Sequence, residues 1–479
     1  MSRFNSVCQW ICDRVQRTEN SECVLRIPVA ITSVILAPYH SRMPLHIRPA
    51  AQLAATLATL FMLGACSSPG VPTVTATPAD ANARTDTAIG ASANPLLLIS
   101  IDGLHPDRIN ATDSPNIARL AAGGVQARWM TPSYPTLTFP NHYTIATGLR
   151  PDRHGIVHNS MSDEALGAFR LSDRDAVSTS AWWGGEPIWV GAEKAGLATA
   201  TMFWPGTEAE VAGVRPTRWN VYDGDVPASQ RAATVAGWLL EPAATRPALA
   251  TLYFEAVDSQ AHGHGPDSDE ARDALAGIDV AIGELLTALE RGGRLQHTNI
   301  VLVSDHGMAP VPTGNAVAVE DMVSPEQARL PSIGQVVTVQ PNPGHEAAVE
   351  ARLLGRKDRY ECWRRDELPA RWHYGTHPRI PAIVCQMDEG WDALPQRILD
   401  RRAGAPAGVR GSHGYDPALP SMRAVFIASG PAFRSGAVIE PIDNVDVYPL
   451  LVRLLGIPAA DHDGDPAALL PALEGDPAH

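Results

Sequence analysis

Short, largely apolar runs recur along the chain from residue 96 onward, and polar residues follow each of them. The clearest runs are Leu96–Ile101, Ala250–Phe254, Ile300–Val303 and Ala424–Ala428. Runs of this length and composition are typical of strands that are buried on both faces of a sheet. The pattern therefore predicts a sheet that lies inside the protein.

Helical periodicity lies between these predicted strands and is clearest from Asp267 to Glu290. Asp267 and Glu270 predict a capping box at the start of this helix, and the pair Gly292–Gly293 predicts its end. Strands that alternate with helices form mostly parallel sheets with helices on both faces. We therefore expect an α/β fold with a mostly parallel central sheet sandwiched by helices.

The segment 318–408 interrupts this alternation with a small unit of its own. Two apolar runs, Val336–Val339 and Ala382–Val384, flank a helical pattern near 345–355. This arrangement predicts a small inserted α+β cap. The main domain is then expected over 95–460, followed by a C-terminal tail over 461–479.

The N-terminal part of the chain has the pattern of an export signal. The basic stretch Met43–Arg48 precedes an apolar run that ends at Leu63–Cys66, which is typical of a signal peptide and too short for a membrane span. The ending also resembles a bacterial lipoprotein signal. We therefore expect residues 43–65 to be removed and Cys66 to be acylated, with cleavage without lipid as the alternative.

The predicted signal also sets what we expect of the other N-terminal residues and of the location of the protein. Residues 1–42 are then expected to be an upstream extension from a misplaced start. The segment 66–94 is rich in Ala, Thr, Pro and Ser without apolar periodicity, which predicts a flexible linker. We expect a periplasmic protein of the bacterial cell envelope that contacts a membrane only through the lipid at Cys66.

Net charge restricts the kind of ligand that we expect, and the cysteine content predicts a covalent crosslink. The formal net charge of the 479-residue chain is -14, which argues against nucleic-acid backbone binding, so any phosphate contact must be local. Apart from Cys66, the mature chain keeps Cys362 and Cys385, and an even pair in an oxidising compartment predicts a disulfide. Two unpaired buried thiols are the alternative.

Acidic and imidazole side chains follow several of the predicted strands. In open α/β sheets, reactive groups gather past the carboxyl ends of strands, and an Asp and a His four positions apart share one face of a helix. Three Asp and three His suffice for two zinc ions with open positions, an arrangement that serves phosphoryl transfer. These candidate ligands are Asp102, Asp258, His262, Asp305, His306 and His413.

A nucleophile for such a site is available in the stretch from Ser133 to His142. Ser133, Thr136 and Thr138 precede a predicted helix, whose amino end favours a phosphate group. The spacing of these three residues does not choose among them.

Ordered motifs over roughly residues 95–455 give a specific resemblance. The motifs are Leu98–Gly103, Thr138–His142, Thr147–Pro151, His154–Ile156, Asn159 and Ser304–Met308. With these motifs, the chain resembles the nucleotide pyrophosphatase/phosphodiesterase family of the alkaline phosphatase superfamily, which implies an alkaline-phosphatase-like fold. The resemblance also implies hydrolysis of nucleotide phosphodiester or phosphoanhydride bonds to nucleoside monophosphates through a phosphothreonine intermediate.

The resemblance also implies a role for each site residue. Thr138 is the nucleophile and shares one zinc with Asp102, Asp305 and His306. The other zinc is held by Asp258, His262 and His413. Asn159 binds a phosphate oxygen, and the substrate is a nucleotide or dinucleotide whose base lies among Phe139, Leu171, Tyr222 and Tyr253. A monomer is favoured.

Some residues and functions have competing interpretations. His264 is a weaker ligand candidate than His262, His142 and His154 are expected to be structural, and Trp182–Trp183 is expected to pack internally. Arg150 and Arg153 keep phosphomonoester or phosphonate hydrolysis open, and a lipid-headgroup diesterase is also possible. The non-enzymatic alternative is a catalytically silent lipoprotein that binds metal or nucleotide.

Overall fold

The computed structural model describes residues 94–404 and 406–475. The predicted upstream extension 1–42, the signal 43–65, Cys66 and the linker up to residue 93 lie outside the described residues. Among the residues described, no helix is both long and apolar enough to cross a membrane.

An eight-stranded sheet forms the centre of the domain, in the order β20-β2-β19-β9-β1-β8-β6-β7. All neighbouring pairs are parallel except those that β19 makes with β9 and β2. The predicted mostly parallel sheet is therefore confirmed. Its strands are β1 Leu96–Ile101, β2 Val125–Ala127, β6 Thr199–Met202, β7 Arg218–Trp219, β8 Leu249–Phe254, β9 Asn299–Val303, β19 Phe426–Ser429 and β20 Ala437–Ile439.

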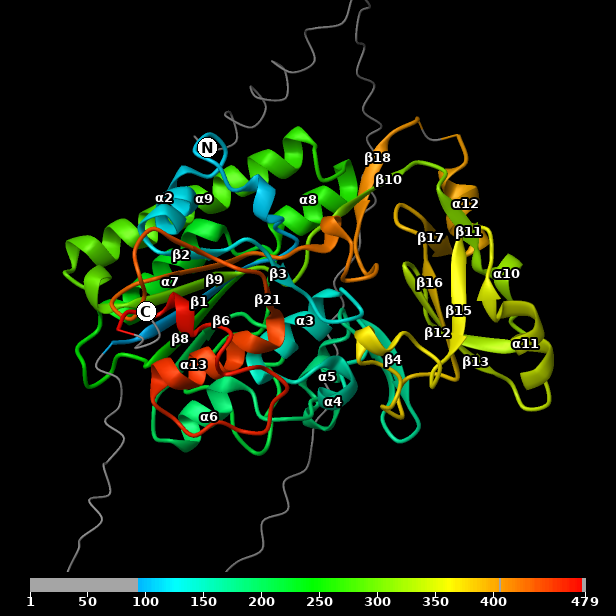
Figure 1. Cartoon of the computed structure of the whole chain (residues 1–479), viewed down its shortest axis with the longest axis horizontal. Coiled ribbons are helices and arrows are strands. Elements are labelled where there is room, and N and C mark those ends of the chain that lie inside the picture. The colour runs from blue at the N-terminus through cyan, green and yellow to red at the C-terminus, as the bar shows by residue number, and fades with distance from the viewer. Residues whose placement is uncertain (1–93, 405, 476–479) are drawn as a thin grey trace, which may run out of the picture. The chain divides into compact units, whose positions relative to one another are not determined.

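Helices cover both faces of this sheet (Figure 1). Successive side chains of a strand point to opposite faces, so β1 contributes Leu97 and Ile99 to one hydrophobic core and Leu96 and Leu98 to the other. The first core is completed by α2 Pro115–Gly123, α7 Ala228–Leu240 and α9 Asp269–Arg291, and the second by α3 Thr138–Thr147, α6 Ile188–Lys194 and α13 Val447–Leu455.

The start of α9 differs from the prediction. Ser268 is the N-cap residue, and its side chain accepts a hydrogen bond from the N–H of Ala271. The predicted capping box of Asp267 and Glu270 is wrong, because the chain enters the helix one residue later and Asp267 pairs instead with Arg108. Gly292 ends the helix as predicted.

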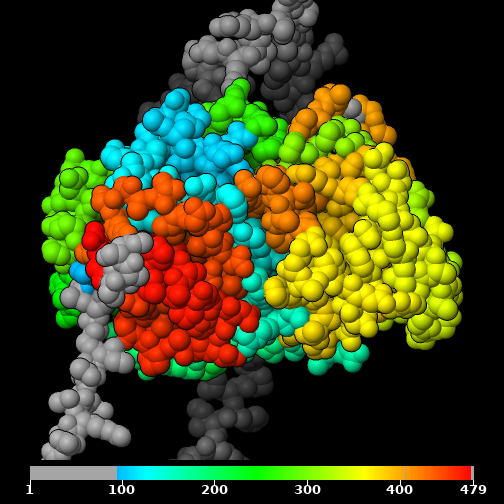
Figure 2. All heavy atoms as spheres, in the orientation of Figure 1, coloured from blue at the N-terminus to red at the C-terminus, as the bar shows by residue number. Residues whose placement is uncertain are grey.

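The inserted cap has a five-stranded antiparallel sheet in the order β12-β13-β16-β15-β14, with α11 against one face. Cys362 and Cys385 face each other across β15 and β16 and form the predicted disulfide. Figure 2 shows the yellow surface of the cap beside the orange and red surface of C-terminal residues. The cap elements are β11 Ala316–Ala318, α10 Val319–Met322, β12 Ala328–Ser332, β13 Val336–Pro341, α11 Glu346–Leu353, β14 Gly355–Arg356, β15 Tyr360–Arg364, β16 Ile383–Met387, β17 Asp392–Leu394 and α12 Gln396–Arg402.

Smaller elements connect the helices and strands of the main domain. A hairpin of β4 Ser160–Asp163 and β5 Gly167–Arg170 follows α3, and a ribbon of β10 Ala309–Pro312 and β18 Val409–Ser412 connects the cap. The others are β3 Met130–Thr131, β21 Ile442–Asp443, α4 Pro151–His154, α5 Arg174–Ser178, α8 Ala256–His264 and the 3-10 turns Pro106–Arg108, Ser180–Trp182, Leu295–His297, Ala370–Trp372, Pro420–Met422, Asn444–Asp446 and Leu470–Ala472.

The segment predicted as a C-terminal tail packs onto the domain as far as residue 475. Leu469, Ala472 and Leu473 are buried in the core that contains α13, and the carboxylate of Asp463 accepts a hydrogen bond from the N–H of Arg150 at 2.8 Å. The described part of this segment therefore belongs to the folded unit.

His154 anchors the helix α3 to the segment that follows it. Its Nδ1 accepts a hydrogen bond from the N–H of Ile156 at 3.1 Å, so Nε2 carries the proton and donates to the carbonyl of Pro140 at 3.2 Å. Burial lowers the pKa of His154 from 6.5 to about 3. This residue is therefore a neutral structural histidine, as predicted.

The lowered pKa of His154 predicts a loss of stability in acid. Below pH 6.5, His154 binds a proton in the unfolded chain but stays neutral in the folded chain. The free energy of unfolding therefore falls as the pH drops from 6.5 toward 3. Between pH 7 and pH 5, wild-type protein should lose about 2 kcal/mol more unfolding free energy than His154→Gln.

Urea unfolding at both pH values, in chelator so that metal release does not contribute, measures this difference. His345→Gln is the matched control because His345 is exposed. The control should lose stability as steeply as wild type. An equally steep loss in His154→Gln would contradict the prediction.

Candidate metal centre and active site

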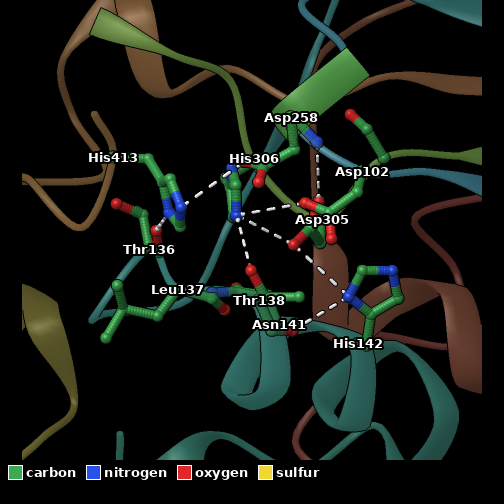
Figure 3. Close-up of polar contacts among 12 residues, drawn as sticks. Asp102, Thr136, Leu137, Thr138, Asn141, His142, Asp258, Asp305, His306 and His413 are labelled. Atoms are coloured by element: carbon green, nitrogen blue, oxygen red, sulfur yellow. Dashed lines mark hydrogen bonds and ion pairs between the residues drawn. The ribbon is translucent and has the colours of Figure 1, made fainter. Parts of the chain in front are cut away.

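Three neighbouring parallel strands deliver carboxylates to one edge of the sheet (Figure 3). Asp102 directly follows β1, Asp305 follows β9, and Asp258 lies in the first turn of α8, which follows β8. His262 is on the same helix, so the predicted spacing of four on a helical turn is confirmed. The carboxyl ends of parallel strands meet at one edge, which brings these residues together.

Asp258, His262 and His413 form one cluster of donor atoms. The Nε2 atoms of the two histidines lie 3.0 Å apart. The Nε2 of His262 is 3.4 Å from Asp258 Oδ2, and the Nε2 of His413 is 3.5 Å from Asp258 Oδ1. The Nδ1 atoms donate to the carbonyls of Gly411 and Thr136, so both Nε2 atoms carry lone pairs that face each other. Facing lone pairs repel unless a cation lies between them.

A second cluster lies around His306. Its Nδ1 donates to the carbonyl of Gly307 at 2.9 Å, which leaves the Nε2 lone pair in the site. That Nε2 is 2.9 Å from Asp305 Oδ2, 3.4 Å from Thr138 Oγ1 and 3.5 Å from Asp102 Oδ1. Asp258 lies close to both clusters, because its donor atoms also group with those of Asp102 and His306.

The carboxylates themselves fit a metal. Asp102 Oδ1, Asp258 Oδ1 and Asp305 Oδ2 are buried and make no hydrogen bond with any residue described by the structure. Burial, reinforced by neighbouring carboxylates, raises the pKa of Asp102 well above its usual range and also raises that of Asp258. Buried carboxylates of this kind need a cation, and the mixed carboxylate and imidazole donors suit a divalent metal such as zinc.

Burial alone would raise the pKa of Asp305 too, but His306 and His142 outweigh it and hold that pKa well below its usual range. His142 Nδ1 lies 2.9 Å from the carbonyl of Thr138 and 3.3 Å from Asp305 Oδ2, while the hydroxyl of Ser100 donates to its Nε2 at 2.8 Å. His142 therefore orients a carboxylate of the site from behind, in keeping with its predicted structural role.

Burial distinguishes the three nucleophile candidates. The hydroxyl of Ser133 donates to Asn444 Oδ1, and the hydroxyl of Thr136 donates to the carbonyl of Tyr415 and accepts from the N–H of Gly414. Both side chains are buried and saturated. Thr138 is the first residue of α3, is partly exposed, and points its hydroxyl at the clusters (Figure 3).

An aromatic pocket of about 220 Å³ opens beside Thr138. Its walls include all four residues predicted to surround a base, namely Phe139, Leu171, Tyr222 and Tyr253. Asn159 lies next to the start of α3, where its Oδ1 accepts a hydrogen bond from the N–H of Phe139 at 2.9 Å. This bond occupies the amide oxygen and leaves the amide NH2 as a donor.

Comparisons with known proteins agree with this geometry. A family model described as type I phosphodiesterase / nucleotide pyrophosphatase matches residues 96–416. This chain belongs to that family. The family is metal-dependent, and the clusters at the edge of the sheet could hold its metal.

Similar proteins come from several organisms. Bovine (Bos taurus) ectonucleotide pyrophosphatase/phosphodiesterase family member 3 is 34% identical over 78% of this chain, which spans 43% of the bovine protein. An uncharacterized pyrophosphatase/phosphodiesterase of Schizosaccharomyces pombe is 33% identical over 78% of this chain and 80% of its own length. The chain thus spans less than half of the bovine relative.

Solved structures of the family share the fold. Murine ectonucleotide pyrophosphatase/phosphodiesterase 5 matches with a TM-score of 0.74 and 31% identity, over 79% of this chain and 100% of that chain. An inactive threonine-to-alanine variant of the same murine protein, in complex with AMP, matches with a TM-score of 0.74 and 30% identity, over 80% of this chain and 100% of that one.

The remaining candidates lie outside the site. His264 is 3.7 Å from Glu270 and belongs to neither cluster. Arg150 pairs with Asp443 at the end of β21, and Arg153 pairs with Asp461 and Asp463 of the C-terminal segment. Trp182 and Trp183 are buried in the core, as predicted.

The hydroxyl of Tyr253, a residue predicted to lie near the base, donates to Asp102 Oδ2 at 2.6 Å. Two residues of this family member's pocket escaped the sequence patterns, namely Arg174 and Glu208, which line the pocket as an ion pair of 2.7 Å. Glu208 follows β6, so the rule that reactive groups lie past strand ends could have indicated it. Arg174 carries no such local signal.

Metal binding should stabilise this family member. Zn²⁺ at a hundredfold excess over its dissociation constant should add about 3 kcal/mol of unfolding free energy for each occupied site, because only the folded chain presents the clusters. Thermal unfolding with chelator and after readdition of Zn²⁺ measures the gain.

His413→Ala should lose part of that gain, since it removes one of the facing lone pairs. The matched control is His264→Ala, which changes an exposed histidine on the neighbouring turn of α8 and should respond to Zn²⁺ as wild type does. A chelator that leaves the melting temperature unchanged would contradict metal binding.

Proposed function

We propose that this chain is an exported, two-zinc nucleotide pyrophosphatase/phosphodiesterase that releases nucleoside monophosphates. The observation that carries the proposal is the position of Thr138, whose hydroxyl lies 3.4 Å from His306 Nε2 in the donor clusters and also lines the aromatic pocket. The family to which the chain belongs and the AMP bound by its murine relative support a nucleotide substrate.

We assign one zinc to Asp102, Thr138, Asp305 and His306, and the other to Asp258, His262 and His413. This division rests on the resemblance of the motifs, and the short distances from His306 Nε2 to the first set and between His262 and His413 support it. When bound, the two ions supply Lewis-acid stabilisation of the attacking and leaving oxygens.

The side chains of the protein would perform the remaining steps. The base stacks between Phe139 and Tyr222, which places the phosphate at the amino end of α3. Asn159 donates its amide NH2 to a non-bridging oxygen. Thr138 Oγ1 then gives up its proton and attacks phosphorus while the bond to the leaving oxygen breaks, and the leaving group takes up a proton. Water next attacks the resulting phosphothreonine, which releases the nucleoside monophosphate and returns a proton to Oγ1.

The placement of the arginines favours diesters and anhydrides over monoesters. A dianionic monoester needs an extra cation beside the nucleophile, yet Arg150 is held in an ion pair with Asp443, and Arg153 is held by Asp461 and Asp463. Arg174, on the pocket wall, is paired with Glu208. A singly charged phosphodiester needs no such cation.

We also propose a periplasmic enzyme held to a bacterial membrane by a lipid on Cys66, with residues 43–65 as its signal. The pattern of the signal and the disulfide between Cys362 and Cys385 support an oxidising compartment. Every residue of the proposed site comes from one chain, which supports activity as a monomer.

Thr138→Ala should lower turnover of the p-nitrophenyl ester of thymidine 5′-monophosphate by at least about a thousandfold, because no covalent intermediate can form. Thr138→Ser should retain measurable turnover. The assay is run beside p-nitrophenyl phosphate, a monoester that wild type should hydrolyse much more slowly.

Thr136→Ala is the matched control, since it removes a nearby hydroxyl that is buried and saturated. It should lower stability but keep the intermediate. Activity that depends on Thr136 instead of Thr138, or a preference of wild type for the monoester, would overturn the proposal.

Tyr222→Ala and Phe139→Ala should each lower kcat/KM for the nucleotide ester by about tenfold, because each removes one stacking face for the base. Hydrolysis of bis(p-nitrophenyl) phosphate, which has no base, should fall much less. Tyr360→Ala, a partly exposed tyrosine of the cap, is the control. Equal losses on both substrates would rule out base stacking.

A further inference from the structure

A cleft of about 820 Å³ lies between the β4–β5 hairpin and the cap. Figure 1 shows the hairpin, in teal, beside the yellow segments of the cap. The cleft shares no lining residue with the aromatic pocket beside Thr138. Its charged lining residues are Arg170, Arg329, Arg365, Arg379, Asp163 and Glu164.

The cap sheet places two of these arginines on the same face. Arg329 on β12 pairs with Gln340 on β13, the N–H of Ala382 lies 3.4 Å from Gln340 Oε1, and the N–H of Arg365 donates to the carbonyl of Ala382 at 3.0 Å. Residues directly opposite each other on neighbouring antiparallel strands share a face. Gln340 and Ala382 lie between the two arginines in this row, and Gln340 also lines the cleft.

This face has two parts with different surroundings. Val336 and Val384, nearer the active site, are buried in the hydrophobic core of the main domain. Arg329, Gln340 and Arg365 lie farther along the same face and line the cleft. The open, polar end of an otherwise buried face is therefore where the arginines gather.

Most of this positive charge has no partner. Arg379 is neutralised by Asp163 at 2.9 Å and donates to the carbonyls of Gly155, Trp182 and Ala181. The guanidinium of Arg365 has no acidic partner among the described residues and donates to the carbonyl of Ile380 at 3.1 Å. The exposed guanidinium groups of Arg170 and Arg329 form no hydrogen bond or ion pair with residues that the structure describes, and Glu164 is the remaining acid.

The other lining residues limit the kind of ligand. They are mainly prolines and short side chains, and the aromatic ring of Phe169 is buried in the core. The cleft therefore offers no exposed ring on which a base could stack. Guanidinium groups in a cleft suit the oxygen atoms of phosphates, which they bind with paired hydrogen bonds.

We propose that this arginine-lined cleft is a second, metal-free phosphate-binding site that takes an oligophosphate group. Phosphates in the cleft could belong to free pyrophosphate or to the distal part of a long substrate. The hairpin connects the two sites, since Arg170 lines the cleft, Leu171 lines the aromatic pocket, and the N–H of Leu171 donates to the carbonyl of Asn159.

Calorimetric titration of the metal-loaded full chain with inorganic pyrophosphate tests the site directly. The catalytic pocket is first saturated with AMP, so that binding reports on the cleft. Arg329→Gln/Arg365→Gln should bind pyrophosphate at least about tenfold more weakly than wild type, because two charged donors are lost. Wild-type binding should also weaken with added salt.

Arg291→Gln, which removes an exposed arginine at the end of α9, is the matched control and should bind as wild type does. Arg170→Gln tests the site from the hairpin side and should also weaken binding. Thermal unfolding confirms that all variants fold. Unchanged binding in the double variant and in Arg170→Gln, or an equal loss in the control, would overturn the proposal.

Kinetics identify the source of the phosphates. Loss of kcat/KM for diadenosine tetraphosphate in the double variant, with unchanged hydrolysis of the p-nitrophenyl nucleotide ester, would assign the cleft to long substrates. Unchanged kinetics on both, with weaker pyrophosphate binding, would assign it to free pyrophosphate. The binding measurement does not depend on catalysis, so an inactive wild-type enzyme would count against the proposed function and not against the cleft.

Discussion

The crowding of buried carboxylates at the carboxyl ends of β1, β8 and β9 is the constraint on which the rest of the structure depends. Asp102, Asp258 and Asp305 are brought together by adjacent parallel strands, and each has a buried oxygen without a hydrogen bond to a described residue, although that of Asp305 lies 2.9 Å from His306 and 3.3 Å from His142. Such an arrangement is costly without a cation. The histidines around it are held by backbone carbonyls so that their lone pairs face inward, which is the complementary half of a metal site.

The helix α3 connects this centre to substrate recognition. Its first residue, Thr138, carries the hydroxyl that contacts His306, its second residue forms an aromatic wall of the pocket, and His142 one turn later lies against Asp305. Because a helix is rigid, these three groups keep a fixed relation to one another. The β4–β5 hairpin lies next to both binding sites. Leu171, which directly follows β5, lines the aromatic pocket, and Arg170 at the end of β5 lines the arginine-lined cleft.

Local patterns predicted much of this. The candidate ligands at strand ends are predictable because an apolar run followed by Asp or His is visible in a few consecutive residues. The carboxyl ends of parallel strands meet at one edge of the sheet, which brings these residues together. The capping box at Asp267 failed because the choice between neighbouring N-caps depends on Arg108, which lies far away in sequence. The C-terminal segment looked like a tail because its few apolar residues show no periodicity, although they complete the core.

The sequence by itself determined the α/β class, the set of metal-ligand candidates and the family, since each is written in contiguous motifs. The spacing of Ser133, Thr136 and Thr138 left three chemically similar hydroxyls open, and the resemblance of the motifs implied Thr138. Only the tertiary structure shows that Asn444, Gly414 and Tyr415 bind the hydroxyls of the first two, whereas Thr138 lies at a helix start with its hydroxyl 3.4 Å from His306 Nε2. The reactivity of a hydroxyl depends on its partners, and those partners come from segments hundreds of residues away.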